Sequence, residues 1–202
     1  PSLECGQSRR PAAAGRAAEC GAHVLLLEKT PRLANKLRLT GKGRCNVTNE
    51  SELDDFVAHF RETGPFLYGA FSRFFVHDLL NFLNRRGVAT VVERGGRVFP
   101  VSNDARQIAD ALEGYLISNK VRIQRNSPVE RILVQSGRVE GVVSSGRERA
   151  ATAVILATGG ASYPRTGSTG DGYRLASELG HHVVKIRPAL VPLMIEEGWA
   201  RE

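Results

Sequence analysis

One stretch of the sequence, residues 150–173 (AATAVILATGGASYPRTGSTGDGY), constrains the fold more than any other. Its apolar run at residues 153–157 belongs to a strand expected over residues 151–157, which passes directly into the turn Thr158-Gly159-Gly160. A second glycine-rich turn, residues 167–172, precedes a helix expected over residues 173–180. Backbone amides can approach a phosphate closely where a strand ends in glycines or a helix begins. We therefore expect half of a dinucleotide site here. The alternative, two tight turns around a loop, is less favoured because a buried strand precedes them.

A second apolar run, VLLL at residues 24–27, ends in Glu28. Continuous apolar runs of this length are typical of strands buried on both faces of a parallel sheet. In a Rossmann unit, the acidic residue that follows the second strand accepts hydrogen bonds from ribose hydroxyls. Glu28 fits that role, but it also fits an ordinary surface glutamate that closes a strand. The pattern alone does not choose between the two.

The glycine fingerprint that normally precedes such a strand is missing. G-X-G-X-X-G is expected about 20 residues upstream of Glu28. There, residues 5–10 read CGQSRR, and no glycine occupies a required position. We interpret residues 1–12 as aberrant, through a frameshift or a misassembled gene, which resequencing the DNA would test.

Because the chain starts with Pro1 and its only methionine is Met194, we also expect an N-terminal fragment of a longer protein.

The loop at residues 36–49, KLRLTGKGRCNVTN, combines glycines with basic and polar side chains. Gly41 and Gly43 permit close backbone approach, so that successive amides can face an anion or a flat ring. The basic side chains of the loop add positive charge, which lowers the pKa of a nearby thiol. Cys45 is therefore either a reactive thiol or a buried, unreactive cysteine, and its spacing does not decide which.

Composition narrows the class of protein. No apolar run is long enough for a transmembrane helix, and the three cysteines form neither a disulfide framework nor a zinc pattern. A reducing, cytoplasmic location is the simplest expectation. The net charge of +7 favours anionic partners, yet the basic residues form no stripe or tail. We therefore expect a small-molecule substrate rather than a nucleic acid. The adjacent His181 and His182 would face opposite sides of a strand, so no metal site is expected.

Strands and helices alternate along the chain and predict an α/β fold with an all-helical insertion at about residues 50–86. Helices are expected to end at residue 20 and to span residues 52–61, 66–86 and 103–116, the last capped by Ser102 or Asn103. Strands are expected at residues 88–92, 97–101, 121–124, 129–135, 138–144 and 151–157. The first two form a hairpin, and Pro100 predicts that the second of them is an edge strand.

Three segments in this order, VLLLEK, TGKGRCNVTN and ATGGASYPRTGSTGDGYRLASELGH, resemble the aminoacetone-oxidase-like (BaiN/YhiN-type) FAD-dependent oxidoreductases. These belong to the glutathione-reductase superfamily, and the resemblance runs from about residue 13 to the end of the chain. It implies a Rossmann-like FAD-binding domain, incomplete, over residues 1–187. Residues 188–202 would then begin an inserted second domain.

The resemblance also implies roles for individual residues. Glu28 would bind the adenosine ribose, with Lys29 and Lys36 near the adenosine and phosphates. Val129 would meet adenine through its backbone. The residues expected along the flavin are Thr40, Gly41, Gly43, Arg44, Cys45 and Asn46. Those expected to line the nucleotide or to form a further cofactor-side turn are Ala157, Thr158, Gly159, Gly160, Gly170, Asp171 and Gly172.

FAD is thus the expected cofactor, with NAD(P)H as a candidate reductant of the intact enzyme and amine oxidation as one candidate reaction. No residue is assigned to catalysis. Two alternatives stay open. A flavoprotein that modifies tRNA is motivated by the net charge of +7. A non-catalytic remnant that does not bind FAD is motivated by the missing fingerprint.

Overall fold

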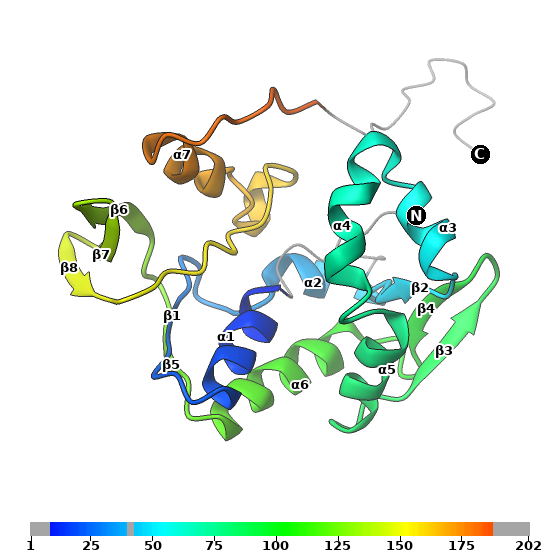
Figure 1. Cartoon of the computed structure of the whole chain (residues 1–202). Helices are drawn as coiled ribbons and strands as arrows, with labels where there is room; N and C mark the ends of the chain where they lie inside the picture. Colours follow the sequence, from blue (N-terminus) through cyan, green and yellow to red (C-terminus); the bar gives the residue numbers. More distant parts are fainter. Residues whose placement is uncertain (1–8, 40–42, 188–202) are drawn as a thin grey trace, which may run out of the picture.

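The computed structural model describes residues 9–39 and 43–187, which contain both helices and strands (Figure 1). The α-helices are α1 (Arg9–Glu19), α2 (Asn35–Leu39), α3 (Leu53–Ala58), α4 (Gly64–Phe71), α5 (Val76–Asn84), α6 (Ala105–Ser118) and α7 (Asp171–Glu178). Two short 3-10 helices are η2 (Arg61–Thr63) and η3 (Pro164–Thr166). The strands are β1 (Leu25–Leu27), β2 (Thr48–Asn49), β3 (Thr90–Glu93), β4 (Arg97–Pro100), β5 (Arg122–Gln124), β6 (Val129–Gln135), β7 (Arg138–Ser144) and β8 (Arg147–Ala150). The expected C-terminal segment 188–202 lies outside the described residues.

The strands form three small sheets. β1 and β5 pair in parallel, with Leu26 opposite Ile123. β2, β4 and β3 form an antiparallel sheet in that order, and β6, β7 and β8 form an antiparallel meander. In Figure 1 the meander lies on the opposite side of the molecule from α3, α4 and α5. The α/β class, the hairpin and the bounds expected for β6 and β7 are confirmed.

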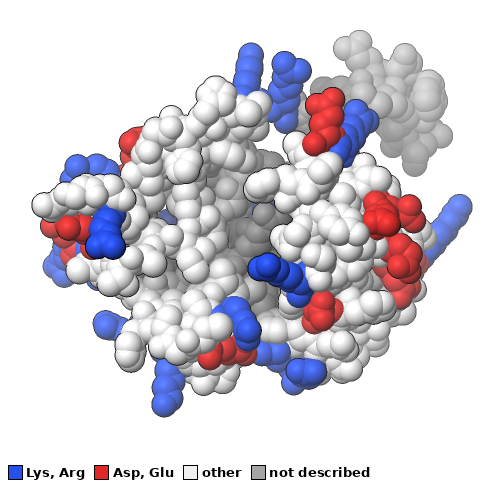
Figure 2. Space-filling model, in the orientation of Figure 1, with Lys and Arg blue, Asp and Glu red and all other residues white. Residues whose placement is uncertain are grey.

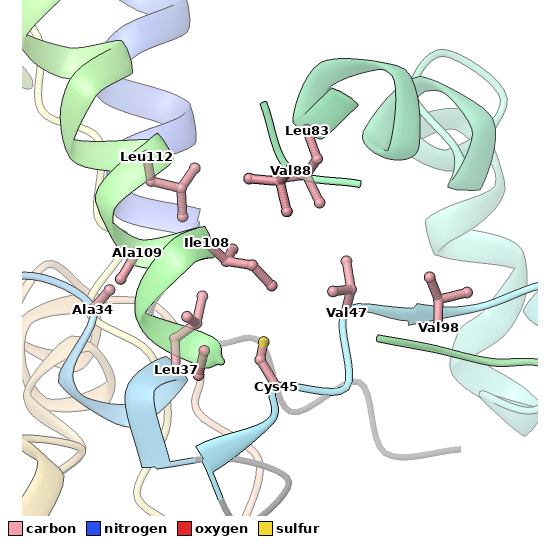
Figure 3. Close-up of a cluster of buried hydrophobic side chains, with 11 residues drawn as sticks. Ala34, Leu37, Cys45, Val47, Leu83, Val88, Val98, Ile108, Ala109 and Leu112 are labelled. Atoms are coloured by element: carbon pink, nitrogen blue, oxygen red, sulfur yellow. The ribbon is translucent and has the colours of Figure 1, made fainter. Parts of the chain in front are cut away.

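Helix α6 is the centre of the core. It contributes Ile108 and Leu112 to a buried cluster with Val47 and Val98, and Figure 3 shows Ile108 pointing toward Val47. Nearer its C-terminus, α6 contributes Leu116 to a separate cluster that contains residues of α1 and β1. Because one helix belongs to both clusters, its burial joins the β1–β5 pair to the β2–β4–β3 sheet.

The single helix expected over residues 66–86 is wrong, because the chain forms α4 and α5 with a break between them. The break is stabilised locally, since the backbone N–H of Phe75 donates to the carboxylate of Asp78 at 2.8 Å, the geometry of a helix N-terminus. The rings of Phe71 and Phe75 both pack edge-on against Phe56 of α3, at 5.2 Å between centroids. The helical spacing of these aromatic residues therefore reflects a cluster between three helices.

Two details of the hairpin region also differ from expectation. β4 is the central strand of its sheet, so the edge position predicted from Pro100 is wrong. β2 reaches only Arg97 and Val98 on β4, so the missing amide of Pro100 removes no hydrogen bond with β2. The cap of α6 is Asp104 rather than Ser102 or Asn103, because its carboxylate accepts the N–H of Arg106 at 2.8 Å.

The strand expected at residues 151–157 is absent, and this stretch has no regular secondary structure. Ala151 donates its N–H to Glu140 at 2.9 Å, but residues 152–156 make no backbone hydrogen bond to any other described residue. A strand needs a neighbouring strand to accept and donate its backbone hydrogen bonds. Among the described residues, no strand of the three sheets pairs with this stretch.

Candidate nucleotide-binding site

Glu28 stands at the carboxyl end of β1 and is 3% exposed, so its interpretation as an ordinary surface glutamate is wrong. Its Oε1 accepts two hydrogen bonds from Thr30, one from the backbone N–H and one from the hydroxyl, both at 2.9 Å. Its backbone N–H donates to Gln124, and its carbonyl accepts the N–H of Ser127. These contacts fix a carboxylate at the end of the parallel strand pair, the position at which α/β sheets bind ligands.

Lys29 connects this end of β1 to the start of α7. Its Nζ donates to Asp171 Oδ2 and to Thr169 Oγ1, each at 2.5 Å, and the Thr169 hydroxyl donates to the other carboxylate oxygen of Asp171. Burial alone would raise the pKa of Asp171. The hydrogen bonds from Lys29 and Thr169, with the positive charges of Lys29 and Arg174, outweigh it and hold that pKa below its ordinary value. Lys29 is therefore already paired with a carboxylate.

A second lysine makes a similar connection. Lys36 of α2 is buried, and its Nζ donates to the hydroxyl of Ser162 at 2.8 Å. Ser162 follows the turn Thr158-Gly159-Gly160. The two lysines expected near the phosphates thus hold the glycine-rich segment 158–172 against β1 and α2.

The two glycine turns are in contact with each other. Gly170 donates its N–H to the carbonyl of Gly160 at 3.2 Å and has a φ of +83°, which favours glycine. At Gly172, an added Cβ would lie 2.2 Å from Thr158 Oγ1, so a side chain does not fit without movement. The structure therefore brings together the expected residues of this segment, which are Thr158, Gly159, Gly160, Gly170, Asp171 and Gly172.

The loop before β2 occupies a different environment. Arg44 donates to Asn103 at 2.7 Å and to the carboxylate of Glu93, and its guanidinium lies 4.2 Å from the centroid of the Phe99 ring. These partners belong to β3, β4 and the segment that precedes α6. Arg44 therefore packs against the β3–β4 hairpin and the segment before α6.

Cys45 is completely buried in the cluster around α6 (Figure 3), which agrees with the unreactive alternative rather than with a reactive thiol. Asn46, the next residue, has a buried side-chain oxygen, Oδ1, with no hydrogen-bond partner among the described residues. Gly43 has a φ of +89° at the start of this loop. Thr40 and Gly41 lie outside the described residues.

A cleft of about 950 Å³ lies between β1 and residues 151–158. Val129, Ala157 and Thr158 line it, as do Lys29 and Asp171 at the end where the ion pair stands. Among the described residues no cluster of three or more histidine, cysteine or acidic side chains could hold a metal ion. On the face of the molecule drawn in Figure 2, lysine and arginine side chains are scattered rather than gathered into one patch.

Sequence reasoning missed the partners that hold the site together. The hydroxyls of Thr30, Ser162 and Thr169 fix Glu28, Lys36 and Lys29 respectively. Thr30 and Thr169 lie two residues from Glu28 and Asp171, respectively. Hydrogen bonds between side chains at this spacing are common in turns, so these two could have been predicted from the sequence. Ser162 gave none, because its partner is 126 residues away.

The family described as the HI0933-like protein Rossmann domain matches residues 12–188. A 3-dehydro-bile acid delta(4,6)-reductase from Clostridium scindens is 34% identical over 176 residues, which are 87% of this chain and 42% of that protein. The ribosomal RNA dihydrouridine synthase of Escherichia coli is 28% identical, and that of Haemophilus influenzae is 27% identical. These two matches cover 92% and 91% of this chain and 46% of each enzyme.

The chain therefore spans less than half the length of the curated relatives it matches. The crystal structure of an oxidoreductase from Methanosarcina mazei superposes on 80% of this chain and 58% of its own, with a TM-score of 0.43 and 16% identity. No described helix has both the length and the apolar composition that crossing a membrane requires.

Proposed function

The chain belongs to the HI0933-like Rossmann-domain family, and on that premise we propose that it is the nucleotide-binding part of an FAD-dependent oxidoreductase. The observation that carries the proposal is the buried carboxylate of Glu28 at the end of β1, joined by the Lys29–Asp171 ion pair to the glycine turns before α7. This arrangement matches the position and chemistry of a ribose-binding acid beside backbone amides.

The residues present fit the adenosine end of FAD. Glu28 would accept hydrogen bonds from the ribose hydroxyls, and the turn Thr158-Gly159-Gly160 would offer backbone groups to the nucleotide. The buried Oδ1 of Asn46 would accept a hydrogen bond from a group that enters the loop before β2. When bound, the flavin supplies the electron and hydride transfer, while the protein orients it and excludes water.

The fit is incomplete at the pyrophosphate. Residues 5–10 carry no glycine fingerprint, and the nearby lysine Lys29 is already paired with Asp171. The cofactor would therefore be held through the adenosine and through backbone amides, and we expect weak binding by this chain alone. The substrate is proposed to be a small molecule, as the name of the Clostridium scindens reductase indicates for that relative. NAD(P)H is proposed as the reductant of the full-length protein.

The test measures FAD binding by the purified chain through flavin fluorescence and through the shift of the melting temperature. A ligand that binds the native state raises that temperature. Glu28→Gln should weaken binding at least tenfold, because a charged hydrogen bond to the ribose contributes about 1.5–3 kcal/mol. Glu148→Gln, on the exposed strand β8, is the matched control and should leave binding unchanged.

If FAD neither changes the melting temperature nor binds with a measurable affinity at millimolar concentration, the chain is a remnant that does not hold its cofactor. Equal binding by the Glu28→Gln and Glu148→Gln variants would show that the cofactor lies elsewhere. In that case the site at the end of β1 is wrong even if the family is right.

An RNA substrate is the second candidate, because two relatives are named ribosomal RNA dihydrouridine synthases and the chain carries a net charge of +7. Filter binding of a ribosomal RNA fragment over a salt series tests it. Contacts with phosphates make affinity fall steeply with salt, with a slope of about −0.7 per contact for single strands. Absence of binding at low salt would exclude this candidate for the chain.

A further inference from the structure

The backbone of Tyr163 lies in the left-handed region, with a φ of 57° and a ψ of 69°. Residues other than glycine are uncommon there, and a bulky aromatic residue is an outlier. Pro164, which follows, adds to the cost, because the residue before a proline favours an extended backbone. Strain of this kind persists only where the surrounding structure imposes it, and it clusters at sites that bind ligands.

Contacts on both sides of Tyr163 impose this conformation. Its carbonyl accepts the backbone N–H of Thr166 at 2.9 Å and the hydroxyl of Thr166 at 2.7 Å, and Thr166 is buried. The preceding residue, Ser162, accepts a hydrogen bond from the buried Lys36. The neighbours therefore hold the backbone, while the side chain of Tyr163 is 68% exposed.

These contacts also locate Tyr163 within the proposed site. Residues 158–172 are attached at two points, beside β1 through Lys29 and on α2 through Lys36. Lys29 follows Glu28, which we place at the adenosine of the cofactor. α2 instead leads toward the loop before β2, where we expect the flavin. Tyr163 follows the residue that Lys36 binds, so it belongs to the attachment on α2.

We propose, as an extension of the function proposed above, that the ring of Tyr163 stacks on the flavin ring system of bound FAD. The flavin is flat and electron-poor, and aromatic rings favour offset stacking with such a partner. The strained backbone then has a function, because it keeps the ring out of the packing of the glycine segment and available to the cofactor. Tyr163 thereby adds affinity for the flavin half of FAD and none for the adenosine half.

The first test separates affinity from stability at this position. Tyr163→Gly removes the ring and suits the left-handed backbone, so it should leave the melting temperature of the chain unchanged or raise it. It should weaken FAD binding at least about fivefold in equilibrium dialysis, because the stacked ring is lost. A ring that served only the fold would lower the melting temperature when removed.

Ser136→Gly is the matched control. Ser136 also has a positive φ, of 50°, and is exposed in the turn between β6 and β7, outside the proposed site. Its replacement relieves the same kind of backbone strain. It should leave the affinity for FAD unchanged.

Tyr163→Phe retains the ring without the phenol, and it should bind FAD as tightly as the wild-type chain does. The fluorescence of the bound flavin should nevertheless be higher in this variant. A tyrosine ring in contact with an excited flavin quenches its fluorescence by giving it an electron and taking the electron back, and a phenylalanine ring does not. This comparison uses a variant that keeps the shape of the side chain, so it does not depend on the folding of Tyr163→Gly.

ADP, which lacks the flavin, locates the contact on the cofactor. Tyr163→Gly should leave the affinity for ADP unchanged, whereas Glu28→Gln should weaken the binding of both ADP and FAD. Equal losses of ADP and FAD affinity with Tyr163→Gly would place the ring at the adenosine and overturn the proposal.

The proposal is also overturned if Tyr163→Gly binds FAD as tightly as Ser136→Gly does, or if bound flavin is equally fluorescent in the wild-type chain and in Tyr163→Phe. In those cases the site beside Glu28 stands as long as Glu28→Gln weakens binding. If Tyr163→Gly lowers the melting temperature, the fluorescence comparison decides. If the wild-type chain binds neither FAD nor ADP, the proposed function fails, and the role of Tyr163 fails with it.

Discussion

At the scale of single residues, Gly172 at the start of α7 has no room for a side chain beside Thr158. Gly172→Ala should lower the free energy of unfolding by about 1–3 kcal/mol, because its Cβ would lie 2.2 Å from Thr158 Oγ1. Thr158→Ala in the same chain leaves Cβ as the nearest atom of residue 158, at 3.5 Å, and should restore most of the loss. Urea denaturation of the two single variants and the double variant measures this coupling.

A glycine in another helix provides the control. Gly114 lies in α6 with open space where a Cβ would stand, so Gly114→Ala should raise the free energy of unfolding by about 0.5–1 kcal/mol. If Gly172→Ala and Gly114→Ala change stability in the same direction, the contact with Thr158 is not a steric constraint.

Asp171 makes the stability of the glycine segment dependent on pH. Its pKa in the folded chain is below the ordinary value, so its contribution to stability is present above the unfolded-state pKa of about 3.9 and is lost as pH falls through the folded pKa. Asp171→Asn should therefore destabilise the chain at pH 7, and the difference from wild type should shrink at acid pH. Chemical denaturation at a series of pH values from neutral to acid measures it. A difference that is constant with pH would contradict the ion pair.

At the scale of elements, α1 and α6 pack through one glycine. A Cβ on Gly15 would lie 2.1 Å from Tyr115 Cε1, so Gly15→Ala should cost about 1–3 kcal/mol although alanine favours helices. Burial, followed by a hydrogen bond to Glu19, raises the pKa of Tyr115 to about 12. The variant should move that pKa toward the ordinary value near 10, which absorbance at 295 nm follows. An unchanged titration with unchanged stability would contradict this contact.

Elements fixed by local signals were predictable from the sequence, and those fixed by distant partners were not. The hairpin of β6 and β7 has its expected bounds because its turn and its apolar residues are adjacent in sequence. Residues 151–157 have a strand-like composition but form no strand. A strand also needs a second strand to pair with, and the composition of one segment does not determine whether that partner is present. In the site, the place of Glu28 could be predicted from the apolar strand that precedes it. The pairing of Lys29 with Asp171 depends on tertiary structure and could not be predicted from the sequence.

At the scale of the whole molecule, α6 joins the two buried clusters, and the described chain should unfold in one transition. Leu112→Ala and Leu116→Ala remove side chains from different clusters and should each cost about 2–5 kcal/mol. Far-UV circular dichroism and tyrosine fluorescence should give the same midpoint for both variants. Separate transitions by the two probes would show that the clusters fold independently.

The ion pair between Lys29 and Asp171 also has a consequence for the order of events during synthesis. The two residues are 142 positions apart. At about 5–20 residues per second, Asp171 leaves the ribosome roughly ten seconds after Lys29. During that interval β1 and its apolar neighbours have no α7 to hold them. Contacts that join such distant parts of a chain form late and slow its folding. We therefore expect the region around β1 to be open to chaperone binding until α7 has been synthesised.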